Sequence, residues 1–145
     1  MSPPAVQNLL PLSSSTHRRI RHVSTPESLR VISLFTGAGG LDLGLEMAGY
    51  KTCACVEIVP VFRATLLRNR PDWNPMEDFG GDITKISADL LLERAGLTKG
   101  EVDVIVGGPP CQSFSNMGKR KGVKDSRGKL YLDYIKIIKD ILPLG

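Results

Sequence analysis

The sequence VISLFTGAGGL, residues 31–41, decides how this chain folds. Residues 31–35 are mostly apolar and have the length of a strand, and a glycine-rich turn follows at 36–40. The residues from Leu41 to about Gly49 predict a helix, because glycine is typical of a helix end. A strand, a glycine turn and a helix in this order predict the first half of a βαβ unit.

Strands and helices alternate in the same way along the rest of the chain. Further strands are predicted at 52–57 and, most strongly, at 102–106, with a brief strand or turn at 82–83. Helices are predicted at about 61–70, 88–95 and 130–142, the first ended by Pro71 and the last by Pro143. Residues 72–81 and 107–128 are predicted to be mostly loop. This order predicts an α/β fold with a partial parallel sheet and flanking helices, in which ligands bind beyond the carboxyl ends of the strands.

Composition limits the class of protein. The 145 residues suit one domain, and a hydrophobic fraction of 41% supports a buried core. No apolar run approaches the roughly 20 residues of a membrane span, so we expect no membrane partner. The net charge of +4 is compatible with a nucleic-acid partner without requiring one. A cytoplasmic, bacterial location is expected because we find no export or membrane signal.

Residues 1–29 differ from the rest of the chain. They contain four prolines, the run Ser13–Thr16 and the basic stretch His17–His22, without sustained hydrophobic periodicity. We therefore expect a disordered leader. An organelle transit peptide and a weak contact of the arginines with a DNA backbone are the alternatives.

Two of the three cysteines, Cys53 and Cys55, lie within a predicted strand. No second pair of cysteine or histidine follows at the spacing of a zinc site, so we expect no metal. The odd count argues against a disulfide framework. Both residues are therefore predicted to be buried or half-exposed thiols of a strand.

Acidic residues follow two of the predicted strands. Glu57 lies twenty residues after Gly37, where an acid commonly accepts hydrogen bonds from ribose hydroxyls. Asp82 can accept a hydrogen bond from an adenine amino group. With the glycine turn, these residues predict a site for an adenosine-containing cofactor, although the turn does not complete the dinucleotide fingerprint G-x-G-x-x-G. The alternatives are a turn that only packs a helix on the sheet and a helix-capping role for Asp82.

The third cysteine, Cys111, follows the strongest predicted strand on a turn made rigid by glycine and proline at 107–110. A thiol there can be a nucleophile where positive charge favours the thiolate, and a buried structural cysteine is the alternative. Six basic residues against the single acid Asp125 follow at 119–129. Such a loop suits a phosphate backbone, although a solvated surface loop has the same composition.

Four motifs in this order resemble the cytosine-C5 DNA methyltransferase family. Residues 35–42, FTGAGGLD, are similar to its first motif, and residues 108–115, GPPCQSFS, are similar to its catalytic motif. Residues 81–83, GDI, resemble the intervening cofactor motif, and residues 125–131, DSRGKLY, the motif after the catalytic loop. The resemblance covers roughly residues 30–142. It implies that 30–145 form the N-terminal part of a Rossmann-like, S-adenosylmethionine-dependent catalytic domain.

The resemblance also implies a cofactor site. Phe35 would contact the adenine face, the turn from Gly37 would hold the amino-acid portion, and Glu57 would bind the ribose. Asp82 would bind the adenine amino group. The full set implied for S-adenosylmethionine is Phe35, Gly37, Gly39, Gly40, Leu41, Glu57, Ile58, Asp82, Ile83, Pro109 and Leu130.

The same resemblance implies the chemistry and the partner. The Cys111 thiolate would attack C6 of cytosine, which activates C5 toward the methyl group, and loss of the C5 proton with expulsion of the thiol would restore aromaticity. The base must leave the duplex to be reached. Residues implied to contact double-stranded DNA are Gln112, Ser113, Ser115, Lys119, Arg120, Lys121 and Arg127.

Several motifs of this family are not found in the sequence, among them a Glu-Asn-Val motif, an arginine motif and a target-recognition region. We therefore expect the chain alone to be inactive, either as a truncation or as half of a split enzyme completed by a second chain. Methylation of DNA by the purified chain would contradict this expectation. The main interpretation is a modification methyltransferase of a restriction system. An RNA cytosine methyltransferase and a non-catalytic regulatory module are the alternatives, and an NAD-dependent dehydrogenase is a remote one.

Overall fold

The computed structural model of the protein describes residues 28–110 and 126–142. A three-stranded parallel sheet lies at its centre, formed by β1 (Arg30–Leu34), β2 (Lys51–Val56) and β3 (Val104–Gly107) in the order β2-β1-β3. From β1 the chain continues to β2 on one side of β1, and it later adds β3 on the other side. The carboxyl ends of β1 and β3 therefore form a topological switch point, where ligands of open α/β sheets bind. The predicted leader lies almost entirely outside the described residues.

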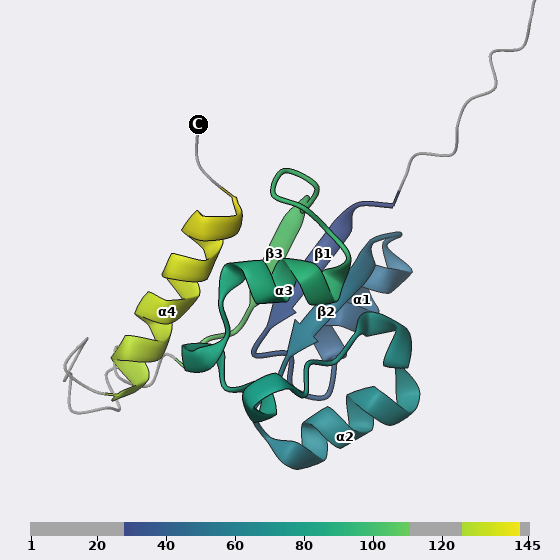
Figure 1. Cartoon of the computed structure of the whole chain (residues 1–145). Helices are drawn as coiled ribbons and strands as arrows, with labels where there is room; N and C mark the ends of the chain where they lie inside the picture. Colours follow the sequence, from purple (N-terminus) through teal and green to yellow (C-terminus); the bar gives the residue numbers. More distant parts are fainter. Residues whose placement is uncertain (1–27, 111–125, 143–145) are drawn as a thin grey trace, which may run out of the picture.

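In the described part of the chain, four α-helices cover both faces of this sheet. They are α1 (Gly40–Met47), α2 (Pro60–Asn69), α3 (Ala88–Ala95) and α4 (Ser126–Ile141). Figure 1 shows α3 in front of the sheet and α1 behind it, with α4 at the left, next to one end of α3 and not parallel to it. This arrangement confirms the predicted α/β class with a parallel sheet and flanking helices.

An apolar core fills the space between the sheet and helices α3 and α4. Ile32 and Leu34 of β1 point into it, and they meet Leu91 of α3 and Ile137 and Ile141 of α4. These side chains alternate along β1 as expected for a strand that is buried on both faces. Fully burying one such aliphatic side chain contributes about 1.5–3 kcal/mol, so this cluster fixes α3 and α4 on one face of the sheet.

The opposite face of the sheet is more polar and contains a small second cluster of Cys55, Leu66 and Trp73. Cys53 and Cys55 are both buried free thiols, which confirms their prediction as strand residues. Burial raises the pKa of the Cys55 thiol to about 12 and also raises the pKa of Cys53. Both therefore stay protonated and inert at neutral pH.

A β-bulge interrupts the pairing of β1 with β2. Val31 pairs with Thr52 and Ile32 pairs with Ala54, so Cys53 is an extra residue in β2. Because side chains alternate along a strand, this extra residue places Thr52 and Cys55 on the same face, toward α1. The apolar alternation in the sequence did not predict this bulge.

Short 3-10 turns occupy the long connection between α2 and α3. They are η1 (Pro71–Trp73), η2 (Asp78–Gly81) and η3 (Ile83–Lys85), so the brief element predicted at 82–83 is a turn. Between the first two turns, Met76 N donates to Cys55 O at 2.9 Å, and the chain forms an isolated parallel bridge at Pro75. This bridge covers part of the outer edge of β2.

The structure moves two predicted boundaries. Helix α4 begins at Ser126, whereas the sequence predicted loop as far as Gly128; this glycine is buried within the helix. Strand β3 begins at Val104, whereas the prediction began at Val102. The side chain of Asp103 accepts hydrogen bonds from Arg30 N at 2.7 Å and Arg30 Nε at 3.1 Å, and Asp103 N donates to Arg30 O at 3.0 Å, so these two residues fix the entry to the strand.

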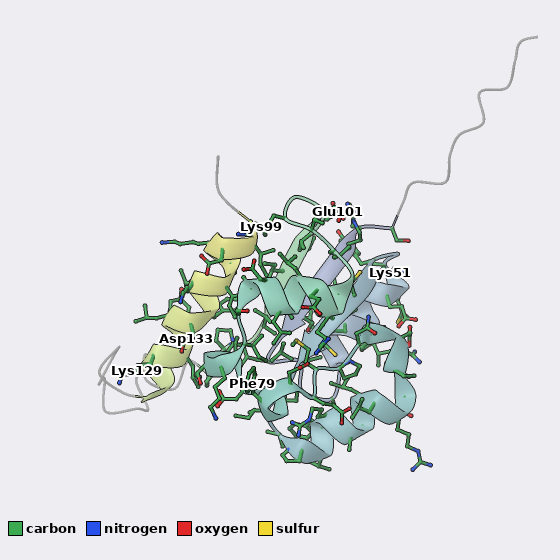
Figure 2. All side chains as sticks on the ribbon, viewed as in Figure 1. Lys51, Phe79, Lys99, Glu101, Lys129 and Asp133 are labelled. Atoms are coloured by element: carbon green, nitrogen blue, oxygen red, sulfur yellow. The ribbon has the colours of Figure 1, made fainter. Side chains whose placement is uncertain are left out.

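The charged side chains of Lys51, Lys99 and Glu101 lie at the periphery, as Figure 2 shows, whereas those of Asp42 and Glu57 are buried. Within residues 28–110 and 126–142, no helix is long and apolar enough to span a membrane.

Candidate functional site

The turns that leave β1 and β2 are joined by the carboxylate of Glu57. Its Oε2 accepts a hydrogen bond from Gly37 N at 2.6 Å, and its Oε1 accepts one from Val59 N at 2.7 Å. The side chain is buried, and both hydrogen bonds are partly buried. A carboxylate has about four acceptor positions, which leaves Glu57 with capacity for a further donor such as a ligand hydroxyl.

The glycine turn offers open space beside this carboxylate. Gly37 has φ +61°, and no neighbouring heavy atom lies within 4 Å of the position that a Cβ would take. Helix α1 starts three residues later at Gly40, so its first amides have no acceptor within the helix. A ligand that approaches the backbone here meets a helix N-terminus, which favours a negatively charged group.

Phe35, between β1 and the turn, has an unusual backbone conformation. Its φ is +56°, in the left-handed region that residues other than glycine rarely adopt. Its ring packs edge-on against Tyr134 of α4, with ring centroids 6.0 Å apart and an interplanar angle of 64°. Strained conformations of this kind cluster at ligand sites, and this one turns Phe35 toward a pocket.

That pocket has a volume of about 130 Å³ and a largely apolar lining. It is smaller than the roughly 300–1,000 Å³ of typical ligand sites, so it suits part of a ligand, such as one flat ring system. Its walls come from the carboxyl ends of β1 and β2, from the turns η2 and η3, and from α4. The residues that line it are Phe35, Val56, Glu57, Ile58, Gly81, Asp82, Ile83, Pro110 and Leu130.

Asp82 lines this pocket and also caps a turn. Its carboxylate accepts hydrogen bonds from Thr84 N at 3.1 Å and Thr84 Oγ1 at 2.7 Å, and it pairs with Lys85 Nζ at 3.2 Å. The hydrogen bond from the Thr84 side chain is the main cause that lowers the pKa of Asp82. The capping role considered from the sequence is therefore present. It does not compete with ligand binding, because an ionised carboxylate keeps spare acceptor positions.

The structure brings most of the predicted cofactor residues together. Six of them line the pocket, namely Phe35, Glu57, Ile58, Asp82, Ile83 and Leu130. Gly37, Gly39 and Gly40 form the adjoining turn, whereas the Leu41 side chain is 56% exposed and does not line the pocket. Pro110 lines the pocket in place of the predicted Pro109.

Three lining residues had no predicted role: Val56, Gly81 and Pro110. Each of them is a sequence neighbour of a predicted residue, and this adjacency is the signal that could have identified them. The predicted nucleophile and most of the predicted nucleic-acid contacts fall outside the described residues, namely Cys111, Gln112, Ser113, Ser115, Lys119, Arg120 and Lys121. Arg127 belongs to the first turn of α4.

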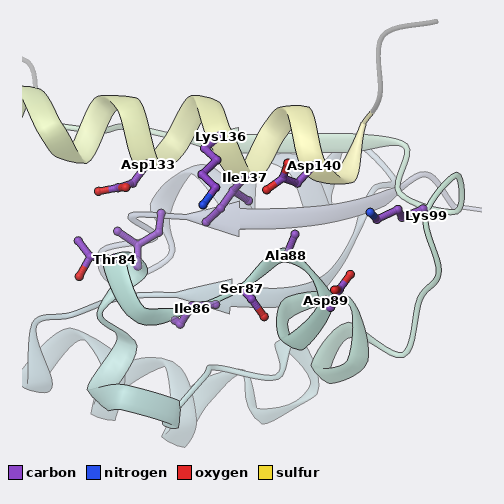
Figure 3. A pocket seen from close by; sticks show the side chains of 11 residues that line it. Thr84, Ile86, Ser87, Ala88, Asp89, Lys99, Asp133, Lys136, Ile137 and Asp140 are labelled. Atoms are coloured by element: carbon purple, nitrogen blue, oxygen red, sulfur yellow. The ribbon is translucent and has the colours of Figure 1, made fainter.

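A second pocket, of about 190 Å³, lies between α3 and α4. Figure 3 shows Lys136 pointing from α4 into this space, with Lys99 approaching from the loop after α3. Three aspartates also line the pocket, which gives it both signs of charge: Asp89, Asp133 and Asp140. This mixture selects neither an anion nor a cation, so we assign the pocket no ligand.

Comparison with known proteins adds a family. The model of the C-5 cytosine-specific DNA methylase family matches residues 29–144. The Type II methyltransferase M.AquIA of Picosynechococcus sp. is 46% identical over 114 residues, covering 79% of this chain and 45% of that protein. M.NgoPII of Neisseria gonorrhoeae is 42% identical over 120 residues, covering 83% of this chain and 32% of that protein. The chain thus spans less than half the length of these curated relatives.

Solved structures give the same fold. A structure described as a DNA modification methyltransferase encoded within an E. coli prophage matches with a TM-score of 0.62 and 33% identity, covering 79% of this chain and 29% of that one. The S. pombe Dnmt2 methyltransferase matches with a TM-score of 0.55 and 22% identity, over 78% of this chain and 32% of that one. The second likeness bears on the fold alone. The parallel sheet with flanking helices is thus the Rossmann-like arrangement found in methyltransferases.

The close approach at Gly81 yields a prediction about the site. Gly81 has φ +72°, and a Cβ there would overlap the carbonyl oxygen of Glu57. Gly81→Ala should destabilise the protein by about 1–2 kcal/mol from the left-handed conformation and by a further ~1–3 kcal/mol from the overlap. Gly100→Ala is the matched control, because Gly100 has φ +88° with no neighbour within 4 Å. Equal shifts of the urea midpoint for the two variants would show that the Gly81–Glu57 contact is not tight.

Proposed function

The chain belongs to the family of C-5 cytosine-specific DNA methylases, and we propose that it is the cofactor-binding, nucleophile-bearing part of an enzyme that methylates C5 of cytosine in DNA. The observation that carries this proposal is the pocket at the carboxyl ends of β1 and β2, beside the Glu57 carboxylate that joins the turns after these two strands. The similar Type II methyltransferases are bacterial, which supports a role as the modification enzyme of a restriction system.

We propose S-adenosylmethionine as the cofactor. When bound, it supplies a methyl group attached to a positively charged sulfur. The described residues suit its adenosine half, because an apolar pocket of about 130 Å³ lies beside two acidic side chains, Glu57 and Asp82. The open turn at Gly37 and the first amides of α1 suit the carboxylate of its amino-acid half. In this assignment Glu57 accepts from ribose hydroxyls while it keeps its two backbone amides.

Cys111 is proposed as the nucleophile that adds to C6 of the cytosine. Pro110, the residue before Cys111 in the sequence, lines the pocket. The thiols of Cys53 and Cys55 are buried in the sheet and have raised pKa values, so they do not compete for this role. We propose that the basic residues at 119–129 contact the phosphates of DNA whose target base has left the stack.

We further propose that additional polypeptide, of the same chain or of a second one, completes the site. Ile58, which lines the pocket, is 57% exposed, and two more large apolar side chains near the start of α1 and of α2 are exposed as well: Leu41 by 56% and Val61 by 65%. Exposed apolar side chains that gather in a patch mark a contact with other protein. This proposal agrees with the share of the relatives that the chain covers.

The cofactor assignment predicts binding of S-adenosylmethionine to the chain. Calorimetry should show saturable binding, which Glu57→Ala should abolish or weaken by more than tenfold, because it removes the ribose acceptor and releases the turn at Gly37. Glu77→Ala is the control, since Glu77 is an exposed acid that does not line the pocket. Unchanged affinity in Glu57→Ala, in a variant that still melts cooperatively, would remove Glu57 from the cofactor site.

The nucleophile assignment predicts the thiol chemistry of the folded chain. A disulfide reagent at neutral pH should modify one cysteine quickly, and this reaction should vanish in Cys111→Ser. The other two thiols should react only after unfolding, because burial keeps them protonated. Fast modification that persists in Cys111→Ser would contradict the assignment.

The exposed apolar surface predicts how the chain behaves alone. The purified chain should transfer no methyl group to DNA and should self-associate at high concentration. Val61→Ser should reduce this association, measured by sedimentation, more than Leu29→Ser does. Leu29 is a suitable control because it is 46% exposed and precedes β1, at the opposite end of the strands. Equal effects of the two substitutions would mean that the surface beside the pocket is not a contact site.

A further inference from the structure

One buried carboxylate has no part in the function proposed above. Asp42 lies in the first turn of α1 and is 0% exposed. Its Oδ2 accepts a hydrogen bond from Ser33 Oγ of β1 at 2.9 Å, and its Oδ1 accepts one from Thr52 Oγ1 of β2 at 3.2 Å. A single side chain thus ties the start of α1 to two strands of the sheet.

The hydrogen bonds continue from Asp42 into the glycine turn. Ser33 has one hydroxyl proton, which it donates to Asp42, so its oxygen is left to accept the proton of Thr36 Oγ1 at 3.1 Å. Thr36 Oγ1 also lies 3.2 Å from Ser33 O and from Val56 O, and Thr36 N donates to Val56 O at 3.1 Å. Thr36 is the residue immediately before Gly37. A chain of hydroxyl groups therefore runs from the turn, through Ser33, to the carboxylate.

This arrangement is costly for stability alone. Burial raises the pKa of Asp42, because the charged form is removed from water, and the hydrogen bonds from Ser33, Thr52 and the backbone of Asp42 itself offset only part of that cost. Even a buried ion pair can often be replaced by apolar side chains of similar volume without loss of stability, so a buried charge is weak evidence for a stabilising role. A role beyond stability is indicated by what Asp42 connects, namely α1, both adjoining strands and, through Ser33, the turn at Thr36.

We propose that Asp42 is a positioning residue that holds the glycine turn at 36–40 in the shape that receives the amino-acid half of the cofactor. The inference rests on the proposed function for the ligand, but the geometry it describes belongs to the chain alone. Glu57, which follows β2, fixes the turn at Gly37 N. Asp42, in α1, fixes it at Thr36 through the hydroxyl group of Ser33. Its loss should therefore affect the turn while the adenosine pocket, built largely from other elements, stays in place.

The first experiment needs no ligand. Amide exchange of the full chain is measured for the wild type, for Asp42→Asn and for Asp89→Asn. Asp89 is the matched control, because it is an exposed first-turn aspartate of α3, a helix with eight residues like α1. Asp42→Asn keeps the shape but presents an NH₂ group where one hydroxyl now donates. Exchange of the amides of Thr36, Gly37 and Gly39 should become about tenfold faster relative to Ile32 in β1, with no such change in Asp89→Asn.

A second variant guards against a general loss of folding. Ser33→Ala leaves the carboxylate in place and removes the hydroxyl group that joins it to Thr36, together with the hydrogen bond from Ser33 to Asp42. It should accelerate the same three amides. If amide exchange in the turn and in β1 becomes faster by the same factor in both variants, Asp42 acts on stability alone and the proposal is wrong.

The ligand experiment separates this inference from the proposed function. Binding of S-adenosylmethionine is compared with that of adenosine, which lacks the amino-acid half. Asp42→Asn should weaken the binding of S-adenosylmethionine about tenfold and leave the affinity for adenosine unchanged. Equal losses for both ligands, or no loss, would overturn the role of Asp42. If the wild type binds neither ligand, the proposed function fails, and the exchange experiment still decides whether Asp42 holds the turn.

Discussion

Two backbone amides that share one buried carboxylate hold the candidate site together. Gly37 follows β1 and Val59 follows β2, so the two turns come from strands that are neighbours in the sheet but are separated by a helix in the sequence. Hydrogen bonds to a charged group contribute about 1.5–3 kcal/mol each. An amide left without its acceptor in this buried place would lose that contribution and draw water into the turn. The shape of the glycine turn therefore depends on Glu57 before any ligand arrives.

The alternation of apolar segments was enough to predict the class of fold. The runs at 31–35 and 52–57 differ from strands β1 and β2 by only a residue at each end, and three of the helices match closely. The start of α4 was missed because Gly128 resembles a loop residue, whereas packing makes it acceptable inside a helix. Tertiary contacts decided that boundary, and the local sequence does not contain them.

The sequence predicted the candidate site about as well as it predicted the fold. The spacing in the sequence predicted that Phe35, Glu57 and Asp82 lie together, because all of them follow strands or turns at the same edge of the sheet, and all three line the pocket. The choice between Pro109 and Pro110 depends on backbone rotation within one turn, which spacing does not encode. Two competing interpretations of Asp82, as a cap and as a pocket residue, proved compatible, because one carboxylate has acceptors for both. Asp42 belongs to the motif at 35–42, but the sequence predicts no role for it, since its burial against Ser33 and Thr52 is a property of the folded sheet.

The bulge at Cys53 has a consequence for how this stretch can change in length. Thr52 reaches Asp42, and Cys55 joins the cluster of Leu66 and Trp73, only because one extra residue lies between them in β2. Deleting or inserting a single residue there would turn one of the two groups to the other face of the sheet. The loop around Gly100 has more freedom, because no heavy atom lies within 4 Å of the position that a Cβ of this residue would take. Natural variation in chain length should therefore accumulate at 96–101, while β2 keeps the same number of residues.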